Sequence, residues 1–418
     1  MRTRVLLISR LTTQNAGNEA LSKLAIRYLQ TRLKNAHLHA VDRYPRSFGS
    51  YSIDKLGPDH VAGFDALARR LSRRFVAKDA PWPAPADMNM VRLNLTAKEL
   101  TGPLRRIKRA IDLRRRLAAV GLIEARSSRI AISACAQADL VIWNPAGEIH
   151  PTGSPNEVMR LLLMMRIAQL HGRRTAVINH SLEIEDPRLR DLVAHVYRAL
   201  DYVGVRDSPS VDVARGLDVS ADKIHEAPDL VFTTLDQGSA RGPGAAIGMA
   251  VNGLEAAGAV DEWKDVVASF EKMGRPIIFV SNAVNHDIGF ARTVAGGHGD
   301  VEIVDRQPGF EELKDIFSRC AVLVSSRLHS SILALAEGVP VVSIEPSVFK
   351  LTAIFEQMQY PLATQNMHVP GWADRVIANT DTCLAEGDDL ARIGLDRMTE
   401  QNERIDKALR PLLALAGS

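Results

Sequence analysis

An arginine and a histidine stand in the turn between an apolar strand and a helix, in the last quarter of the chain. Arg327 and His329 follow the apolar run 321–324 and precede a helix expected from about Ser330 to Gly338. In α/β sheets, ligands bind in the crevice beyond the carboxyl ends of the strands. The first free N–H groups of a helix, together with an arginine, favour an anion. This pattern predicts a site that holds an anionic ligand and moves a proton.

The composition is typical of a soluble globular protein. The 418 residues are enough for two or three domains, and 46% are hydrophobic and 24% charged. Cys135, Cys320 and Cys383 are too few and too scattered for a disulfide framework or a zinc cluster. The apolar run near the start is too short for a signal peptide, and no run approaches the ~18 apolar residues of a membrane span. These features predict a cytoplasmic protein.

Basic residues are concentrated in one segment. Residues 69–129 hold sixteen Lys or Arg and five acidic residues, whereas the whole chain has a net charge of only +3. A basic segment on an acidic body indicates a local anionic partner and argues against a nucleic-acid binder. Part of it, about 104–126, is expected to form a helix with apolar residues near one face. The segment could contact an anionic membrane peripherally, or form a solvated face or lid that draws anionic substrate.

Strands and helices alternate along the chain, which is typical of the α/β class. Apolar runs predict strands at 5–9, 37–41, 138–143, 174–179, 202–205 and 227–232, with helices between most of them. A Gly-rich linker at 236–244 precedes a second α/β series that starts at residue 246. Two such series predict two Rossmann-like, doubly wound domains with a cleft between them, in a GT-B-like arrangement. The expected boundaries are 1–238, with a basic helical insertion at about 45–128, 244–385 with the Arg-x-His motif, and a C-terminal helix at 386–418.

Four motifs occur in a fixed order along this framework. They are Asn15–Leu21, Val205–Ser210, Ala227–Leu230, and Ser326–Ser330 with the following Ala334–Pro340 and Lys350. The ordered set resembles the polysaccharide pyruvyl transferases, which move a pyruvyl group from phosphoenolpyruvate onto two hydroxyls of a sugar as a cyclic ketal. One feature departs from that family, which usually has a glycine run after the strand at 138–143. Here the segment 144–151 has a single glycine, and Glu148 is a candidate replacement for a polar contact.

The resemblance implies a donor site for phosphoenolpyruvate, which carries a carboxylate and a phosphate. Arginine suits both groups, because its planar fork makes paired, charge-assisted hydrogen bonds. The candidate donor-binding residues are Arg206, Ser326, Arg327, His329 and Lys350. Arg327 and His329 are the catalytic candidates, and His329 either protonates the methylene carbon or stays charged and stabilises the leaving phosphate.

The resemblance also implies an acceptor, which is a glycan of the cell envelope or an exopolysaccharide, or its lipid-linked precursor. Candidates for the acceptor side or for the first loop are Asn15, Gly17, Asn18 and Glu148. Neither a metal nor a cofactor is expected, because phosphoenolpyruvate serves as a co-substrate and no His, Asp or Glu cluster has ligand spacing.

Several of these residues also have a purely structural interpretation. Arg206 and Asp207 could form an ion pair beside a capped helix, Asp229 could hold a turn, and Lys350 could lie on the surface. Two other functions stay open. His329, Glu337 and the following Gly-Val-Pro are similar to the donor-binding helix of GT-B glycosyltransferases that use nucleotide sugars, and a non-catalytic scaffold could retain the fold. A dehydrogenase is disfavoured, since no Gly-x-Gly-x-x-Gly follows either first strand.

Overall fold

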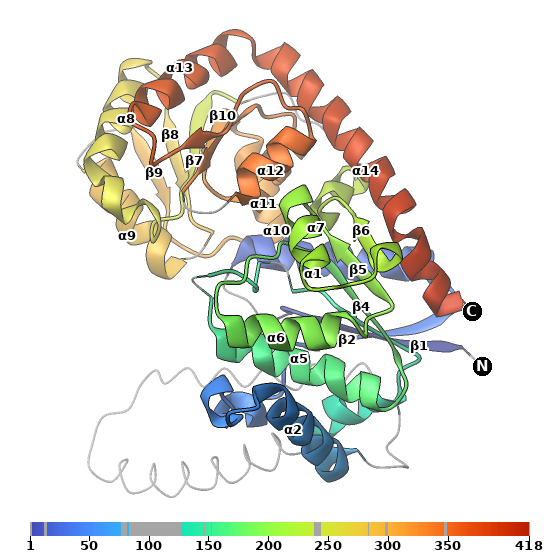
Figure 1. Ribbon diagram of the computed structural model, residues 1–418. Helices are drawn as coiled ribbons and strands as arrows, with labels where there is room; N and C mark the ends of the chain where they lie inside the picture. Colours follow the sequence, from blue (N-terminus) through green and yellow to red (C-terminus); the bar gives the residue numbers. More distant parts are fainter. Residues whose placement is uncertain are drawn as a thin grey trace, which may run out of the picture.

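Two parallel sheets dominate the computed structural model of the chain (Figure 1). The residues that the structure describes are 2–11, 15–76, 82, 128–145, 147–151, 153–237, 244–282, 284–296, 300–346 and 349–417. Each sheet has six strands, and helices cover both of its faces. The expected α/β fold with two doubly wound units is therefore confirmed.

The first sheet has the strand order β2-β1-β3-β4-β5-β6. Its strands are β1 (Thr3–Ser9), β2 (Ala36–Asp42), β3 (Leu140–Trp143), β4 (Arg174–His180), β5 (Tyr202–Val205) and β6 (Ile224–Glu226). Alternate side chains of β1 point to opposite faces: Val5 and Leu7 enter the core beneath one helix layer, and Leu6 and Ile8 enter the other. The first layer contains α1 (Ala16–Arg32), and the second contains α2 (His60–Phe75), α5 (Pro155–Leu170) and α6 (Pro187–Tyr197).

The second sheet has the strand order β12-β11-β10-β7-β8-β9. Its strands are β7 (Ala246–Ala250), β8 (Ile277–Val280), β9 (Val301–Val304), β10 (Cys320–Ser325), β11 (Val341–Glu345) and β12 (Gln365–Asn366). One face packs on α8 (Val260–Lys272), α9 (Val284–Ala295) and α13 (Trp372–Ala385). The other face packs on α10 (Phe310–Phe317), α11 (Leu328–Ala336) and α12 (Lys350–Gln357).

The predicted strand at 227–232 is wrong. The last strand of the first sheet is β6, which ends at Glu226, and Leu230–Gln237 forms the 3₁₀ helix η5. Pro228 follows β6, and the side chain of Asp229 accepts a hydrogen bond from the N–H of Val231 (2.9 Å), which turns the chain. The apolar residues that resembled a strand instead fill the core between the two sheets.

Some elements near the ends of the second sheet were not predicted from the sequence. Helix α9, strand β9 and helix α13 were not expected, because short apolar runs with interspersed glycines and polar residues carry little periodicity.

The beginning of the expected insertion at 45–128 belongs to the core of the first domain. Its first third forms two 3₁₀ helices, Arg46–Ser50 and Ile53–Lys55, and then α2, whose apolar side chains are buried beside α5 and α6. The expected basic helix at about 104–126 lies outside the described residues.

Helix α14 (Gly387–Gly417) leaves the second sheet and runs along the first, as Figure 1 shows in red. Its Asp406 accepts a hydrogen bond from the hydroxyl of Tyr28 on α1 (2.8 Å), and its Ala408 carbonyl accepts one from Tyr202 on β5 (3.0 Å). One continuous apolar cluster joins α1, η5, α10, α11 and α14. The two domains therefore share a core as well as a connecting chain.

The carboxyl ends of both sheets meet at the domain junction. Each sheet has a topological switch point, between β1 and β3 in the first and between β7 and β10 in the second. Residues beyond β1 contact residues beyond β8 and β10: Ala16 N–H donates to the carbonyl of Asn282 (3.4 Å), and Gly17 lies against His329. Among the described residues, no helix is both long and apolar enough to cross a membrane.

Candidate active site

His329 lies in the first turn of α11, beyond the carboxyl end of β10. Arg327 is the N-cap residue of this helix, and the hydroxyl of Ser325 accepts a hydrogen bond from its N–H (3.0 Å). The imidazole packs on the other domain, because a Cβ built at Gly17 would be 2.6 Å from Nδ1 of His329. Only glycine allows this approach of α1 to the ring.

Asp229 joins His329 to Arg206 across the junction. Its Oδ2 lies 2.7 Å from Nη1 of Arg206 and 3.4 Å from Nε2 of His329, and both Asp229 and Arg206 are fully buried. Burial by itself would raise the pKa of Asp229, but the nearby charges of His329 and Arg206 hold that pKa at about 2. Asp229 is therefore an anion at neutral pH, and it lies between Arg206 and His329.

Two further polar residues orient Arg206, which follows β5. Its Nε donates to the hydroxyl of Ser181 (3.0 Å), and that hydroxyl donates to Oδ2 of Asp207 (2.5 Å). Asp207 also caps α7 (Ser208–Arg215), where its Oδ1 accepts from the N–H of Ser210 (2.9 Å). The expected alternative of a direct Arg206–Asp207 ion pair is therefore wrong: Arg206 pairs with Asp229, and Asp207 acts through Ser181.

Arg327 is held by an acid from α9. Its Nη2 lies 2.5 Å from Oδ1 of Asp287, which also accepts from the N–H of Gly253 (3.1 Å). Within the part of the chain that the structure describes, Nε of Arg327 and the hydroxyl of Ser330 are buried without a hydrogen-bond partner. Ser326 has another function, since its hydroxyl accepts from the N–H of Asn252 (2.7 Å) and thereby links β10 to the loop after β7.

Lys350 opens α12 and packs against the loop that follows β3. A Cβ built at Gly147 would be 3.3 Å from Nζ of Lys350, so the single glycine of segment 144–151 lies at this contact. Burial lowers the pKa of Lys350 to about 8, and the charge of Arg206 acts in the same direction. Burial also raises the pKa of Glu345, the last residue of β11, to about 7. Lys350 thus lies at the junction and not on an open surface.

The first loop has a mainly structural arrangement. Asn15 is the N-cap of α1, and its Oδ1 accepts a hydrogen bond from the N–H of Asn18 (3.1 Å). Gly17, in the first turn of α1, contacts the candidate catalytic side chain of His329. The loop therefore positions α1 so that its first turn supports His329.

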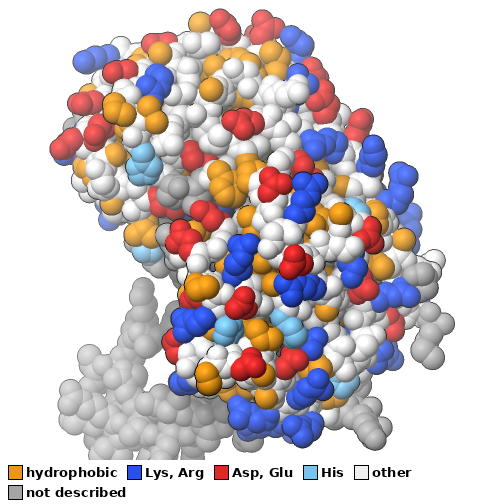
Figure 2. All heavy atoms as spheres, viewed as in Figure 1, with side chains coloured by type: hydrophobic (Ala, Val, Ile, Leu, Met, Phe, Trp, Pro, Cys, Tyr) orange, Lys and Arg blue, Asp and Glu red, His pale blue; other side chains and the backbone are white. Residues whose placement is uncertain are grey.

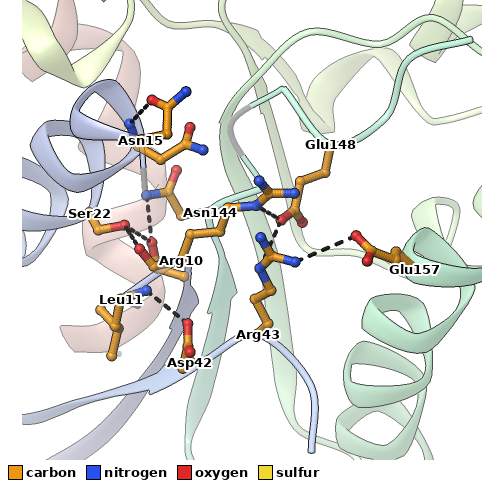
Figure 3. A network of polar contacts seen from close by, with 11 residues as sticks. Arg10, Leu11, Asn15, Ser22, Asp42, Arg43, Asn144, Glu148 and Glu157 are labelled. Carbon is orange, nitrogen blue, oxygen red and sulfur yellow. Dashed lines mark hydrogen bonds and ion pairs between the residues drawn. The ribbon is translucent and has the colours of Figure 1, made fainter. Parts of the chain in front are cut away.

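Glu148 belongs to a cluster of charges at the switch point of the first sheet (Figure 3). Arg10, just beyond β1, binds its carboxylate through Nε, and Nε of Arg43, just beyond β2, lies 3.7 Å away. Arg43 also reaches Glu157 at the start of α5 (3.5 Å). Glu148 was a candidate from the sequence and the two arginines were not, although Arg10 directly follows the predicted strand 5–9 and Arg43 lies two residues after the predicted strand 37–41.

Two more titratable residues lie beyond strand ends and were missed. Glu183 follows β4, and burial raises its pKa, while Lys350 opposes this shift. His150 follows β3, and burial together with the charges of Lys350 and Arg10 lowers its pKa to about 4, so the ring is neutral. The position of each residue after a parallel strand was the signal that could have identified it.

Two other expectations can be compared with the geometry. Glu337, the residue that suggested nucleotide-sugar binding, lies at the opposite end of α11 from His329 and pairs with Lys314 (3.1 Å). The described residues hold no group of three or more His, Cys, Asp or Glu that could bind a metal ion. The three cysteines are buried and unpaired.

Solved structures similar to this chain show the same fold. An α,α-trehalose 6-phosphate synthase from Burkholderia multivorans matches with a TM-score of 0.55 and 12% identity, covering 100% of this chain and 97% of that one. A UDP-N-acetylglucosamine 2-epimerase from Rickettsia bellii matches with a TM-score of 0.53 and 14% identity, covering 100% and 98%. MnaA of S. aureus, in a structure with UDP, matches with a TM-score of 0.52 and 11% identity, covering 100% and 98%. These likenesses confirm the GT-B-like architecture and concern the fold alone.

The sequence comparisons identify the family. No curated protein matches the chain. The model of one family, described as polysaccharide pyruvyl transferase, matches residues 15–347, which include every candidate site residue except Lys350. The ordered motifs, the GT-B-like fold and this match agree, and the chain belongs to the polysaccharide pyruvyl transferase family.

Proposed function

We propose that this protein transfers the pyruvyl group of phosphoenolpyruvate to two hydroxyls of a sugar, forming a cyclic ketal and releasing phosphate. The acceptor is a glycan of the envelope or an exopolysaccharide, or its lipid-linked precursor. One observation carries the proposal: buried polar atoms without partners surround the N-terminus of α11. Among the described residues, these atoms include Nε of Arg327, Nε2 of His329 and the hydroxyl of Ser330. A buried polar atom without a partner indicates a ligand that would satisfy it.

The charges at the junction suit the donor. Phosphoenolpyruvate carries a carboxylate and a phosphate, and three cations lie beyond the carboxyl ends of strands at the junction: Arg206, Arg327 and Lys350. Two of these cations are already oriented by buried acids, so little side-chain freedom is lost when an anion binds. Each charge-assisted hydrogen bond to the ligand would contribute roughly 1.5–3 kcal/mol.

In the reaction that we propose, His329 gives a proton to the methylene carbon of phosphoenolpyruvate. A sugar hydroxyl then forms a bond to the adjacent carbon, and the bond between that carbon and the phosphate oxygen breaks. The second hydroxyl bonds to the same carbon and closes the ketal. Of the two hydroxyl protons, one replaces the proton that His329 gave up, and the other leaves on the phosphate. Asp229 supports the positive charge of His329, and Gly17 fixes the plane of its ring.

The acceptor could approach the site from the side of the basic helix α2. Four arginines of α2, which belong to the basic segment 69–129, are exposed: Arg69, Arg70, Arg73 and Arg74. The apolar side of α2 is buried in the domain core, so these arginines would contact an anionic membrane by charge alone. Elsewhere on the face shown in Figure 2, acidic and basic side chains are interspersed. We propose a peripheral membrane contact through segment 69–129, of which these four arginines are described residues.

Calorimetric titration with phosphoenolpyruvate, UDP and UDP-sugars tests the donor. We expect phosphoenolpyruvate to bind, and the variant Arg327→Gln to weaken that binding about tenfold to a hundredfold, as the loss of one charged hydrogen bond implies. A matched control is Arg319→Gln, because Arg319 pairs with exposed Glu302 outside the junction. Binding of UDP or a UDP-sugar in place of phosphoenolpyruvate would favour a glycosyltransferase, and no binding at all would favour a scaffold.

A further inference from the structure

The switch point of the first sheet carries a pair of arginines that the proposed donor site does not use. Arg10 follows β1 and Arg43 follows β2, so both side chains lie at the carboxyl edge of the sheet, next to the loop after β3. In open α/β sheets this crevice is a ligand site. The equivalent position in the second sheet, between β7 and β10, holds Arg327.

One buried carboxylate orients both arginines, as Figure 3 shows. The side chain of Glu148 is 5% exposed, while those of Arg10 and Arg43 are 24% and 28% exposed. Both use Nε toward Glu148, and within the described chain neither Nη atom of Arg10 makes a hydrogen bond. A guanidinium held through Nε presents its two terminal nitrogens as a fork, which matches the oxygens of a phosphate.

The backbone at Arg43 is strained. Its φ is +33°, a left-handed value that side-chain-bearing residues rarely adopt, and its N–H donates to the carbonyl of Ser9 (3.0 Å). The loop after β1 is also bound to the end of β2, because Asp42 accepts a hydrogen bond from the N–H of Leu11 (2.9 Å). Strain of this kind persists where the surrounding structure enforces it, and it is concentrated at functional sites.

The remaining contact of Arg43 is easily displaced. Glu157 is 41% exposed and lies 3.5 Å away, and an exposed ion pair of this length contributes little. Burial lowers the pKa of nearby His150 to about 4, and the charges of Lys350 and Arg10 act in the same direction, so its ring is neutral. Glu148 directly follows Gly147, where a Cβ would be 3.3 Å from Nζ of Lys350, so the arginine pair lies near the proposed donor site.

We propose that Arg10 and Arg43 form a second anion site that binds a phosphate attached to the acceptor sugar. This inference rests on the proposed function, because it assigns the second site to the acceptor. It deepens that function by naming the acceptor class: a sugar phosphate or a saccharide linked through a diphosphate, not a neutral free saccharide. Glu148 is a positioning residue that aims both guanidiniums.

Pyrophosphate, added to the full-length protein already saturated with phosphoenolpyruvate, tests this site by calorimetry. We expect it to bind without displacing phosphoenolpyruvate, and Arg43→Gln to weaken pyrophosphate binding at least tenfold while the affinity for phosphoenolpyruvate changes less than twofold. Arg43→Lys keeps the charge but lacks the guanidinium fork, so its affinity for pyrophosphate should lie between those of the original protein and Arg43→Gln. The matched control is Arg166→Gln, because Arg166 pairs with Asp65 (2.7 Å) on the helical face away from the junction and should bind pyrophosphate like the original protein.

A variant of Arg10 could unfold the loop, because it would leave buried Glu148 unpaired. The double variant Arg10→Gln with Glu148→Gln removes both charges, and thermal unfolding confirms that it is folded. If that double variant or Arg43→Gln binds pyrophosphate as tightly as the original protein, or if pyrophosphate competes with phosphoenolpyruvate, the second site does not exist. If phosphoenolpyruvate fails to bind but pyrophosphate binding still depends on Arg43, the anion site stands and the proposed donor falls.

Three probes then distinguish the sources of the phosphate. Glucose 1-phosphate represents a sugar phosphate, UDP-glucose a nucleotide sugar, and geranyl diphosphate a lipid diphosphate. We expect at least one to bind more tightly than pyrophosphate and to lose at least tenfold in affinity in Arg43→Gln. Equal, weak and Arg43-independent binding of all three would overturn the assignment to the acceptor.

Discussion

The backbone of Gly17 lies directly against the imidazole of His329. A Cβ at position 17 would be 2.6 Å from Nδ1 and 2.9 Å from Cβ of the histidine, well inside normal contact. The two residues belong to different domains, α1 of the first sheet and α11 of the second. The orientation of the proposed catalytic ring therefore depends on how the two domains pack.

We predict that Gly17→Ala disables the site with little effect on the fold. The added methyl group must push the His329 ring out of place, and a displacement of about 1 Å can cost roughly a hundredfold in rate. Phosphoenolpyruvate affinity and phosphate release in the presence of an acceptor should both fall at least tenfold. A suitable control is Gly289→Ala, since a Cβ built on that glycine of α9 has no atom within 4 Å. Normal turnover in Gly17→Ala would contradict the contact.

Removal of the charge of Asp229 should destabilise the protein. The variant Asp229→Asn leaves the buried guanidinium of Arg206 without its counter-charge, and breaking a buried pair of this kind costs about 3–5 kcal/mol. Urea unfolding measures the loss. Asp218→Asn is the control, because Asp218 pairs with Arg198 on the surface and should change the free energy of unfolding by less than about 0.5 kcal/mol. A loss below 1 kcal/mol in Asp229→Asn would mean that Arg206 finds another partner.

The same carboxyl should make stability depend on acid pH. Its pKa is about 2 in the folded protein and near 3.8 in the unfolded chain, so the unfolded state binds more protons between these values. The stabilisation is complete above about pH 4 and is lost as the pH falls toward 2, with a total of roughly 2–3 kcal/mol. Urea unfolding at a series of pH values should show the original protein converging on Asp229→Asn in this window. Parallel curves for the two proteins would exclude the shift.

Lys350 should reduce stability while it supports binding. Its pKa of about 8 lies below the ordinary 10.5, so the unfolded chain binds more protons between pH 8 and 10.5, and the stability contribution rises with pH across that window. At pH 7 the variant Lys350→Met should gain about 1–3 kcal/mol and lose at least tenfold in affinity for phosphoenolpyruvate. In the original protein that affinity should fall as the pH rises through 8.

Lys264→Met provides the comparison for Lys350, because Lys264 is an exposed residue of α8 that pairs with Asp261. Thermal unfolding and calorimetry on both variants separate the two effects. If Lys350→Met is no more stable than the original protein, then burial does not disfavour this charge. If it also binds phosphoenolpyruvate normally, Lys350 is not part of the donor site.

Much of the framework was predictable because buried parallel strands are continuous apolar runs. The strand at 202–205 was predicted with its observed bounds, and β1, β2, β3 and β4 differ from prediction by a few residues at most. The expected strand at 227–232 failed for the opposite reason: an apolar run shows that a segment is buried and does not show its geometry. Pro228 and the Asp229 side chain turned that segment into a 3₁₀ helix between the domains.

By itself, the sequence determined the fold class, the family resemblance and the position of Arg327 and His329 at a strand-to-helix turn, since all of these are properties of neighbouring residues. Only the tertiary structure decided which side chains contact one another across the site. Arg10 meets Glu148 across 138 positions because β3 lies beside β1, and Gly17 reaches His329 because the two domains pack through a shared core. Strand order and domain packing follow from the burial of whole faces, and residue periodicity does not encode them.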